Sequence, residues 1–320
     1  MTLLEVRGSN LRGLQRYRGR FAPSPTGPLH LGSLYTALAG FLQAKSNQGE
    51  WLLRVDDADL PRVTPGATDC ILRALERFGL TWDGSVVLQS HKLEAYQAAL
   101  RQLDDAGWLY ACTCSRKTLS ALPHRSLTGN APYPGTCRFA SHEPNQAHAL
   151  RVVTEGSLVS FEDKLQGPQQ WDIAEEFGDF IVFRRDGIVA YHLATVIDDW
   201  QAGVTEVLRG CDLLESTPLQ IHLQQLLGLP TPVYRHIPII VDCHGIKLSK
   251  QNLAMPVTEG NPSRILSLLL GMLGLSPPEE LRNAPPAEII AWAVTAWDIS
   301  RLSGKAVNEP EEMARECQMR

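Results

Sequence analysis

The stretch RFAPSPTGPLHLGSLYTALAG, residues 20–40, predicts a strand, a tight turn and a helix in direct succession. The turn is PSPTGP, whose prolines and glycine interrupt regular structure. Apolar residues then recur at the spacing of a helix: Leu34, Leu38, Phe41 and Leu42. HLGS, residues 30–33, stands where that helix begins. Free N–H groups and a partial positive charge at a helix N-terminus suit a phosphate, although a histidine there can also simply cap the helix.

Strands and helices continue to alternate beyond this stretch, which indicates an α/β fold with a parallel sheet. We expect strands at 51–57 and 205–210, and helices from Pro65, at 94–106 and at 216–229. Residues 180–198 read as strand-like sequence with a hairpin turn at Asp186-Gly187, and the residues after Asn252 read as helical.

This pattern predicts three parts. A Rossmann-type catalytic domain comprises residues 20–110 and 181–235. An insertion rich in proline, glycine, histidine and serine occupies 111–180, and a loop with a helical C-terminal module occupies 236–320.

Composition excludes several classes of protein. The chain has 320 residues, 44% of them hydrophobic, and contains no apolar run long enough to span a bilayer. Residues 1–19 make too weak an apolar segment for a signal peptide, so we expect a cytoplasmic protein with no membrane partner. Seven cysteines, an odd number, suit a reducing compartment. A net charge of −5 still allows binding of tRNA through a local basic face.

A second motif, KLSK at residues 247–250, follows the apolar run IPIIVD and a His-Gly turn. Lys247 and Lys250 could clamp a polyphosphate while Ser249 donates a hydrogen bond. Each motif alone is short and unspecific, since KxSK is usually a solvated surface loop. Both motifs in this order, flanking an α/β domain, point to a nucleotide-binding enzyme.

These segments together resemble the catalytic domain of the glutamyl-tRNA synthetases, which are class I aminoacyl-tRNA synthetases. Residues 20–40 match its opening, and LLRVDDAD, AYHLATVIDDW and VLRGCDLLESTPLQI follow in the family's order through about 230 residues. HLGS resembles the HIGH motif of class I, and KLSK resembles KMSKS.

The resemblance implies that ATP, accompanied by Mg²⁺, activates L-glutamate by reaction at its α-phosphate. It assigns catalysis to His30, Lys247 and Lys250. The residues implied to bind ATP are Pro23, His30, Gly32, Ser33, Lys247, Ser249 and Lys250. The residues implied to bind glutamate are Arg20, Phe21, Ala22, Ser24, Asp56, Tyr191 and Arg209. Asp56 departs from the family, which usually has a glutamate there to receive the substrate ammonium; its side chain is one methylene shorter.

Three cysteines gather in the predicted insertion, at Cys112, Cys114 and Cys137. Tetrahedral zinc needs four ligands, and the candidates for the fourth are Tyr133, His124 and His142. The arrangement CxC…YxxxC resembles the zinc knuckle of the short glutamyl-Q tRNA(Asp) synthetases, which favours Tyr133 and one structural zinc per chain. The remaining cysteines are expected to be unligated: Cys70, Cys211, Cys243 and Cys317.

Only 68 residues follow Asn252, too few for the anticodon-binding region of a glutamyl-tRNA synthetase. The resemblance therefore implies the short paralogue, which transfers activated glutamate to the queuosine base in the anticodon of tRNA(Asp), and we expect a monomer. Two alternatives stand: a truncated glutamyl-tRNA synthetase that charges a tRNA 3′ end, or an inactive paralogue that only binds tRNA. The motif residues needed for phosphate binding are all present, which disfavours the second.

Overall fold

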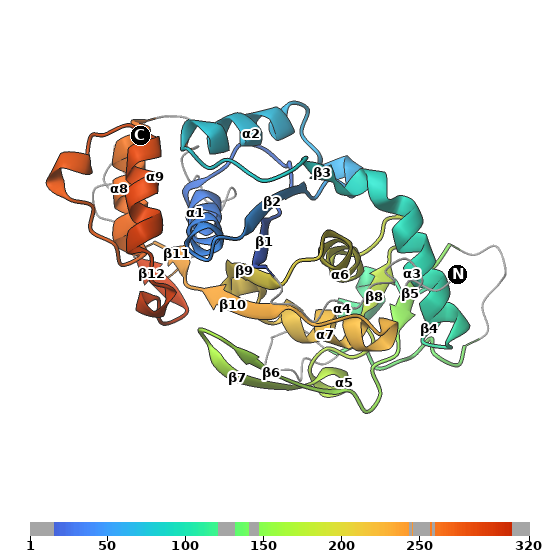
Figure 1. Ribbon diagram of the computed structural model, residues 1–320. Helices are drawn as coiled ribbons and strands as arrows, with labels where there is room; N and C mark the ends of the chain where they lie inside the picture. The colour runs from blue at the N-terminus through green and yellow to red at the C-terminus, as the bar shows by residue number, and fades with distance from the viewer. Residues whose placement is uncertain are drawn as a thin grey trace.

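The structure is a computed structural model, shown in Figure 1. It describes residues 16–120, 132–140, 147–242, 245, 257 and 260–308. Within these residues, no helix combines the length and apolar character required to cross a membrane.

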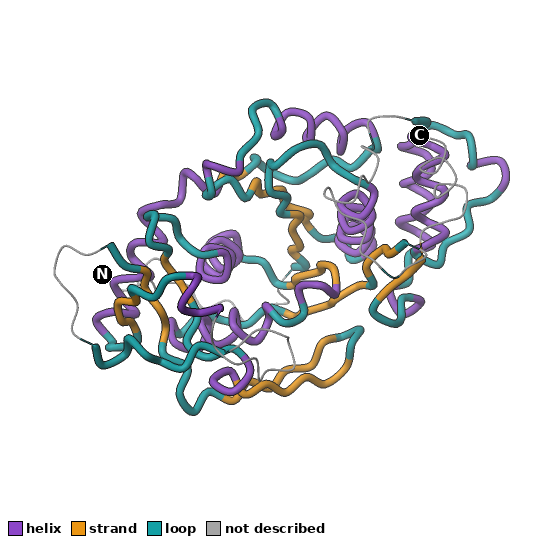
Figure 2. Tube along the Cα trace, turned by 180° about the vertical axis from the view of Figure 1, so that it is seen from behind, coloured by secondary structure: helices purple, strands orange, loops and turns teal. Residues whose placement is uncertain are grey.

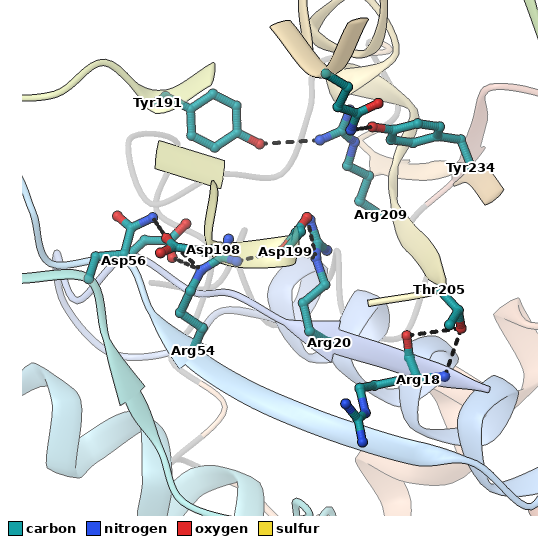
Figure 3. Close-up of polar contacts among 12 residues, drawn as sticks. Arg18, Arg20, Arg54, Asp56, Tyr191, Asp198, Asp199, Thr205, Arg209 and Tyr234 are labelled. Atoms are coloured by element: carbon teal, nitrogen blue, oxygen red, sulfur yellow. Dashed lines mark hydrogen bonds and ion pairs between the residues drawn. The ribbon is translucent and has the colours of Figure 1, made fainter. Parts of the chain in front are cut away.

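A parallel sheet forms the centre of the molecule. Strand β1 (Arg18–Phe21) pairs with β2 (Glu50–Val55), which pairs with β3 (Val87–Leu88), and on the other side β9 (Glu206–Gly210) pairs with β10 (Val233–Ile237). The two groups join where the Thr205 N–H donates to the Arg18 carbonyl at 2.9 Å (Figure 3). The strand order therefore reverses between β1 and β9, which is where ligands bind in open α/β sheets.

Helices cover this sheet, and all of those named next except α6 were expected from the sequence. They are α1 (Leu31–Ser46), α2 (Ala67–Arg77), α3 (Leu93–Asp105), α6 (Tyr191–Ala202) and α7 (Ser216–Leu227), with short 3-10 turns at 60–62, 89–92, 211–213, 279–281 and 299–301. Helix α1 packs across β1, β2 and β9. The Trp51 indole lies stacked near Phe21 and edge-on to Phe41, so the strand–turn–helix unit has its own apolar core. The predicted strands and helices in these regions are confirmed.

One predicted element is wrong. The strand-like reading holds for β8 (Ile181–Phe183) and for the turn at Gly187, but residues 191–202 form α6. Seven consecutive residues of α6 are buried, from Leu193 to Asp199. A helix that is buried on nearly all sides loses the 3.6-residue polar alternation, so its apolar run cannot be told from a strand by pattern alone.

The predicted insertion contains more regular structure than its composition suggested. Strands β4 (Leu109–Cys112), β5 (Ala149–Val152) and β8 form an antiparallel sheet, so β8 pairs with this region and not with the parallel sheet. A hairpin of β6 (Leu158–Asp163) and β7 (Gly167–Asp172) extends beneath β10 (Figure 1). Two short helices complete the region: α4 (Arg116–Ser120) and α5 (Ile173–Glu176).

The C-terminal part is helical as predicted, with α8 (Pro262–Met272) and α9 (Pro286–Ala296). Helix α9 packs against α1, so this module shares the core of the parallel sheet (Figure 2). Strand β12 (Ala306–Asn308) was not predicted; it pairs in parallel with β11 (Ile239–Val241).

Candidate active site

A cavity of about 380 Å³ opens at the point where the strand order reverses. Its walls come from the carboxyl ends of β1, β2 and β9, the first turns of α1, and β11. The predicted ATP and glutamate residues that the structure describes all line it: Arg20, Phe21, Ala22, Pro23, Ser24, His30, Gly32, Ser33, Asp56, Tyr191 and Arg209. Lys247, Ser249 and Lys250 lie outside the described residues.

One wall is the N-terminus of α1, a 16-residue helix with no acidic side chain in its first turn. His30 is its N-cap: Nδ1 accepts from the Ser33 N–H at 3.3 Å, and Nε2 lies 2.9 Å from Ser33 Oγ. Because Nδ1 accepts, a neutral ring carries its hydrogen on Nε2. The capping alternative is therefore realised, and the Nε2–H donates to the Ser33 hydroxyl, which a phosphate oxygen would have to replace to receive this hydrogen bond.

A buried cluster of charges lies beside the cavity, which Arg20, Arg54 and Asp56 line and Asp198 and Asp199 do not. Asp199 of α6 accepts from Arg20 Nε at 3.1 Å and from a terminal nitrogen of Arg54 at 2.5 Å. Arg54 Nε also donates to Asp56 at 2.7 Å and lies 3.6 Å from Asp198. The side chains of these five residues are at most 9% exposed. Arg54 and Asp56 therefore belong to a buried ion-pair cluster and not to a solvated surface.

Asp56 is thus already partnered. One of its oxygens is bound by Arg54, while the residue still lines the cavity. Burial raises the pKa of Asp56, against the pull of Arg54. A substrate ammonium would share this carboxylate with Arg54 and would not meet a free anion.

The two aspartates of α6 differ in their pKa. Burial raises the pKa of Asp198 to about 6, opposed by Arg54 and by hydrogen bonds from Tyr96 and Gln89. Burial acts on Asp199 in the same direction, but Arg20 and Arg54 outweigh it and hold its pKa below the usual range of an aspartate. Asp199 is therefore the member that stays ionised between the two arginines.

Arg209 has a different environment on the wall formed by β9. It is 4% exposed, and its described hydrogen-bond acceptors are neutral: His236 Nε2 at 3.0 Å, Thr217 Oγ1 at 2.7 Å and the Tyr191 hydroxyl at 3.4 Å. Figure 3 shows the contact with Tyr191. Among the described residues no carboxylate forms an ion pair with it. A buried cation with neutral partners favours an anionic ligand.

The sequence reasoning missed Asp199, Thr217 and His236. Asp199 and Thr217 fall within segments that match the family, but no local signal marks them as neighbours of arginines on distant strands. His236 stands in an apolar strand, where a polar residue is a weak signal of a buried partner.

The predicted zinc ligands converge. The sulfur atoms of Cys112, Cys114 and Cys137 all lie within 4.8 Å of one another, and the Tyr133 hydroxyl is 3.5 Å from those of Cys112 and Cys114. A tetrahedral zinc ion with bonds of about 2.3 Å to sulfur and about 2.0 Å to oxygen separates its ligand atoms by roughly 3.5–3.8 Å. The donor set therefore fits zinc. His124 and His142 lie outside the described residues.

The protonation of these groups also bears on a metal. Burial raises the pKa of Cys137, but hydrogen bonds, chiefly from Tyr133 and the Thr113 backbone, outweigh it and lower the pKa to about 6. Burial raises the pKa of the Tyr133 phenol, so ligation there requires a metal to displace its proton. The Arg151 guanidinium lies 3.7 Å from the centre of the Tyr133 ring, where it favours negative charge on the phenol.

Comparison with known proteins identifies the family. A profile of the catalytic domain of class I tRNA synthetases (E and Q) matches residues 16–284. The Methylococcus capsulatus glutamyl-Q tRNA(Asp) synthetase is 53% identical over 288 residues, which cover 89% of this chain and 93% of that protein. The Aromatoleum aromaticum protein of the same name is 50% identical over 285 residues, covering 88% and 89%. The chain belongs to the glutamyl-Q tRNA(Asp) synthetase family.

Solved structures agree with this family and confirm the class I catalytic fold. The glutamate-tRNA synthetase of Elizabethkingia anophelis matches with a TM-score of 0.75 and 25% identity, covering 94% of this chain and 69% of that one. A glutamate tRNA ligase of Elizabethkingia meningosepticum, solved in complex with its amino acid, gives the same score over 95% and 70%. The predicted resemblance is confirmed, and the chain is a ligase-type enzyme.

The charge cluster predicts the effect of replacing Asp199. Asp199→Asn keeps the shape but leaves Arg20 and Arg54 without their shared carboxylate, so we expect a loss of about 3–5 kcal/mol in the free energy of unfolding at pH 7. Because the pKa of Asp199 is depressed, its stabilisation is full above about pH 4 and disappears as pH falls further. Urea denaturation of the wild type and the variant at several pH values measures both the loss in free energy of unfolding and its dependence on pH.

The matched control is Asp69→Asn. Asp69 forms an exposed pair with Arg73 at 3.9 Å, so the substitution should cost less than about 1 kcal/mol. If the two substitutions lowered the free energy of unfolding equally, Asp199 would not stabilise the fold by pairing with Arg20 and Arg54.

Proposed function

We propose that this enzyme activates L-glutamate with ATP and transfers the glutamyl group to the queuosine base of tRNA(Asp). The observation that carries the proposal is the cavity itself, where a helix N-terminus without acidic residues and a buried Arg209 with neutral partners line one space. The first suits a phosphate and the second a carboxylate. The curated relatives carry the name of this activity.

In the activation step, an oxygen of the glutamate α-carboxylate bonds to the α-phosphorus of ATP. The bond from that phosphorus to the bridging oxygen breaks, and pyrophosphate leaves with the electron pair. Mg²⁺ bound to ATP would neutralise part of the phosphate charge. In the transfer step, a nucleophile of queuosine attacks the acyl carbon, and the bond from that carbon to the phosphate oxygen breaks. AMP leaves with the electron pair, and the proton of the nucleophile passes to the departing phosphate or to water. The enzyme needs no nucleophile of its own, so its work is alignment and charge stabilisation.

Each role follows from the position of a side chain. The backbone N–H of Gly32 at the start of α1, together with His30 and the hydroxyl of Ser33, would bind phosphate oxygens. Arg209 and Tyr191 would hold a carboxylate of glutamate. Asp56 would receive the ammonium while it keeps its bond to Arg54.

The other residues assigned from the resemblance keep proposed roles. Arg20, which is paired with Asp199, would complete the amino-acid pocket. The pocket-lining residues proposed to shape the site are Phe21, Ala22, Pro23 and Ser24. Lys247, Ser249 and Lys250 would close over the polyphosphate.

We propose a single structural zinc ion held by Cys112, Cys114, Tyr133 and Cys137. Four ligands from the protein would leave no position for substrate, so the ion would serve to tie β4 to the segment around Cys137. We also propose that the enzyme acts as a monomer in the cytoplasm. The division into a catalytic domain (20–110 and 181–235), an insertion (111–180) and a C-terminal module (236–320) remains a prediction.

Transfer of labelled glutamate tests the proposed function. With ATP, the purified enzyme should label tRNA(Asp) that carries queuosine and should leave tRNA(Asp) without queuosine unlabelled. tRNA(Glu) serves as the control for reaction at the 3′ end. Labelling of tRNA(Glu) would make the chain an aminoacylating synthetase, and no labelling of any tRNA would favour a tRNA-binding paralogue.

Removal of one thiol tests the zinc site. We expect purified wild-type protein to hold about one zinc per chain. Cys112→Ser should lower the zinc content severalfold and the melting temperature with it, because metal binding contributes to folding. Cys70→Ser, at an exposed cysteine of α2, is the control and should retain zinc. A zinc-free wild-type protein whose Cys112→Ser variant melts at the same temperature would exclude the site.

A further inference from the structure

Arg209 is held by a buried chain of polar groups that begins outside the cavity. Its Nε–H donates to His236 Nε2 at 3.0 Å, and His236 Nδ1 lies 2.5 Å from an oxygen of Asp163. The side chains of His236 and Asp163 have no measurable exposure. Neither residue lines the cavity, so both would act on a ligand through Arg209.

The hydrogen-bond directions fix the state of the histidine. Arginine only donates, so His236 Nε2 must offer a lone pair and the ring hydrogen must be on Nδ1, facing Asp163. A neutral ring therefore stands between the carboxylate and the guanidinium. Burial lowers the pKa of His236, and Asp163 only partly opposes this, which agrees with a neutral ring.

Asp163 is itself held rigidly by the hairpin of β6 and β7. Its second oxygen accepts from the backbone N–H groups of Leu165 at 3.0 Å, Gln166 at 2.8 Å and His236 at 3.2 Å. The Gln166 side chain donates to the His236 carbonyl at 2.8 Å, so the end of the hairpin is fastened to β10. The region predicted to be an insertion thus contributes a residue that supports the amino-acid pocket.

We propose that Asp163 and His236 are positioning residues that hold Arg209 oriented and without a paired charge, so that the pocket selects a side-chain carboxylate, glutamate, over a carboxamide, glutamine. The inference rests on the proposed function. Arg20 and Arg54 in the same cavity are paired with Asp199, whereas the histidine keeps Asp163 one ring away from Arg209. A carboxylate ligand would supply the missing charge, and a neutral amide would leave the buried cation uncompensated.

The side-chain carboxylate is the better partner for chemical reasons. The α-carboxylate is the nucleophile, and tight pairing with a guanidinium would lower its electron density. Its charge also disappears when the adenylate forms, whereas the side-chain carboxylate keeps its charge throughout. A guanidinium has five N–H donors, of which the described bonds of Arg209 use three, so two remain for a ligand.

Glutamate-dependent ATP–pyrophosphate exchange tests the inference, with KM and kcat measured for glutamate, glutamine and ATP. In His236→Ala the acceptor for Arg209 is lost, and we expect the KM for glutamate to rise roughly 10- to 100-fold while the KM for ATP changes less than about twofold. The preference for glutamate over glutamine should fall about tenfold. In Asp163→Ala the ring hydrogen of His236 is no longer held on Nδ1 and can move to Nε2, where it would face the donor of Arg209. This variant should therefore also raise the KM for glutamate and lower the preference for glutamate over glutamine.

His236→Gln is the rescue variant, because its amide oxygen can again accept from Arg209. Its KM for glutamate and its preference for glutamate over glutamine should return most of the way to the wild-type values. Glu162→Gln, at the exposed neighbour of Asp163, is the matched control and should behave as wild type. Thermal melting checks that each variant folds. If His236→Ala does not fold, His236→Gln and Asp163→Asn are measured in its place. Asp163→Asn is then expected to change the KM for glutamate and not the KM for ATP.

The outcomes separate the inference from the proposed function. Wild-type exchange with no change in KM or selectivity in the folded variants would overturn the inference alone. A parallel rise in the KM for glutamate and ATP, or no recovery in His236→Gln, would also overturn it. No glutamate-dependent exchange by the wild type would remove the proposed function and the inference together.

Discussion

The bridge of Asp199 between Arg20 and Arg54 is the interaction on which the rest of the site depends. The two arginines come from neighbouring strands, β1 and β2, and the aspartate comes from α6, 145 residues along the chain from Arg54. Any one of these charges would be costly to bury alone. The strands and the helix can therefore pack at this edge of the sheet only in the arrangement that matches the charges. That arrangement places the cavity at the point where the strand order reverses.

The arginines of the cavity divide into two kinds by their partners. Arg20 and Arg54 form ion pairs with aspartates, whereas Arg209 donates to a histidine, a threonine and a tyrosine. A cation that folding leaves without an anion is available to a ligand. The N-terminus of α1 supplies the second positive region, so one cavity offers places for a carboxylate and for a phosphate. This combination is what activation of an amino acid by ATP requires.

Much of this could be predicted from sequence, because local signals determine it. The turn at PSPTGP and the helical spacing from Leu34 predicted the first strand–turn–helix unit, and the sequence motifs predicted residues that line the cavity. Helix α6 was mistaken for a strand because burial removed its polar face. The Asp163–His236 pair joins residues 73 apart, and the hairpin that carries Asp163 was hidden in sequence without clear alternation. Such pairings leave no periodic trace, so only the structure reveals them.

We propose that the cavity binds glutamyl adenylate with the side-chain carboxylate on Arg209 and the phosphate at the N-terminus of α1. A crystal structure of the enzyme with a non-hydrolysable glutamyl-adenylate analogue tests it most directly. We expect the side-chain carboxylate to lie within about 3 Å of the terminal nitrogens of Arg209 and the phosphate mimic to lie beside His30 and Gly32. An analogue whose side-chain carboxylate instead contacts Arg20 or Arg54, or whose phosphate mimic lies away from α1, would contradict it.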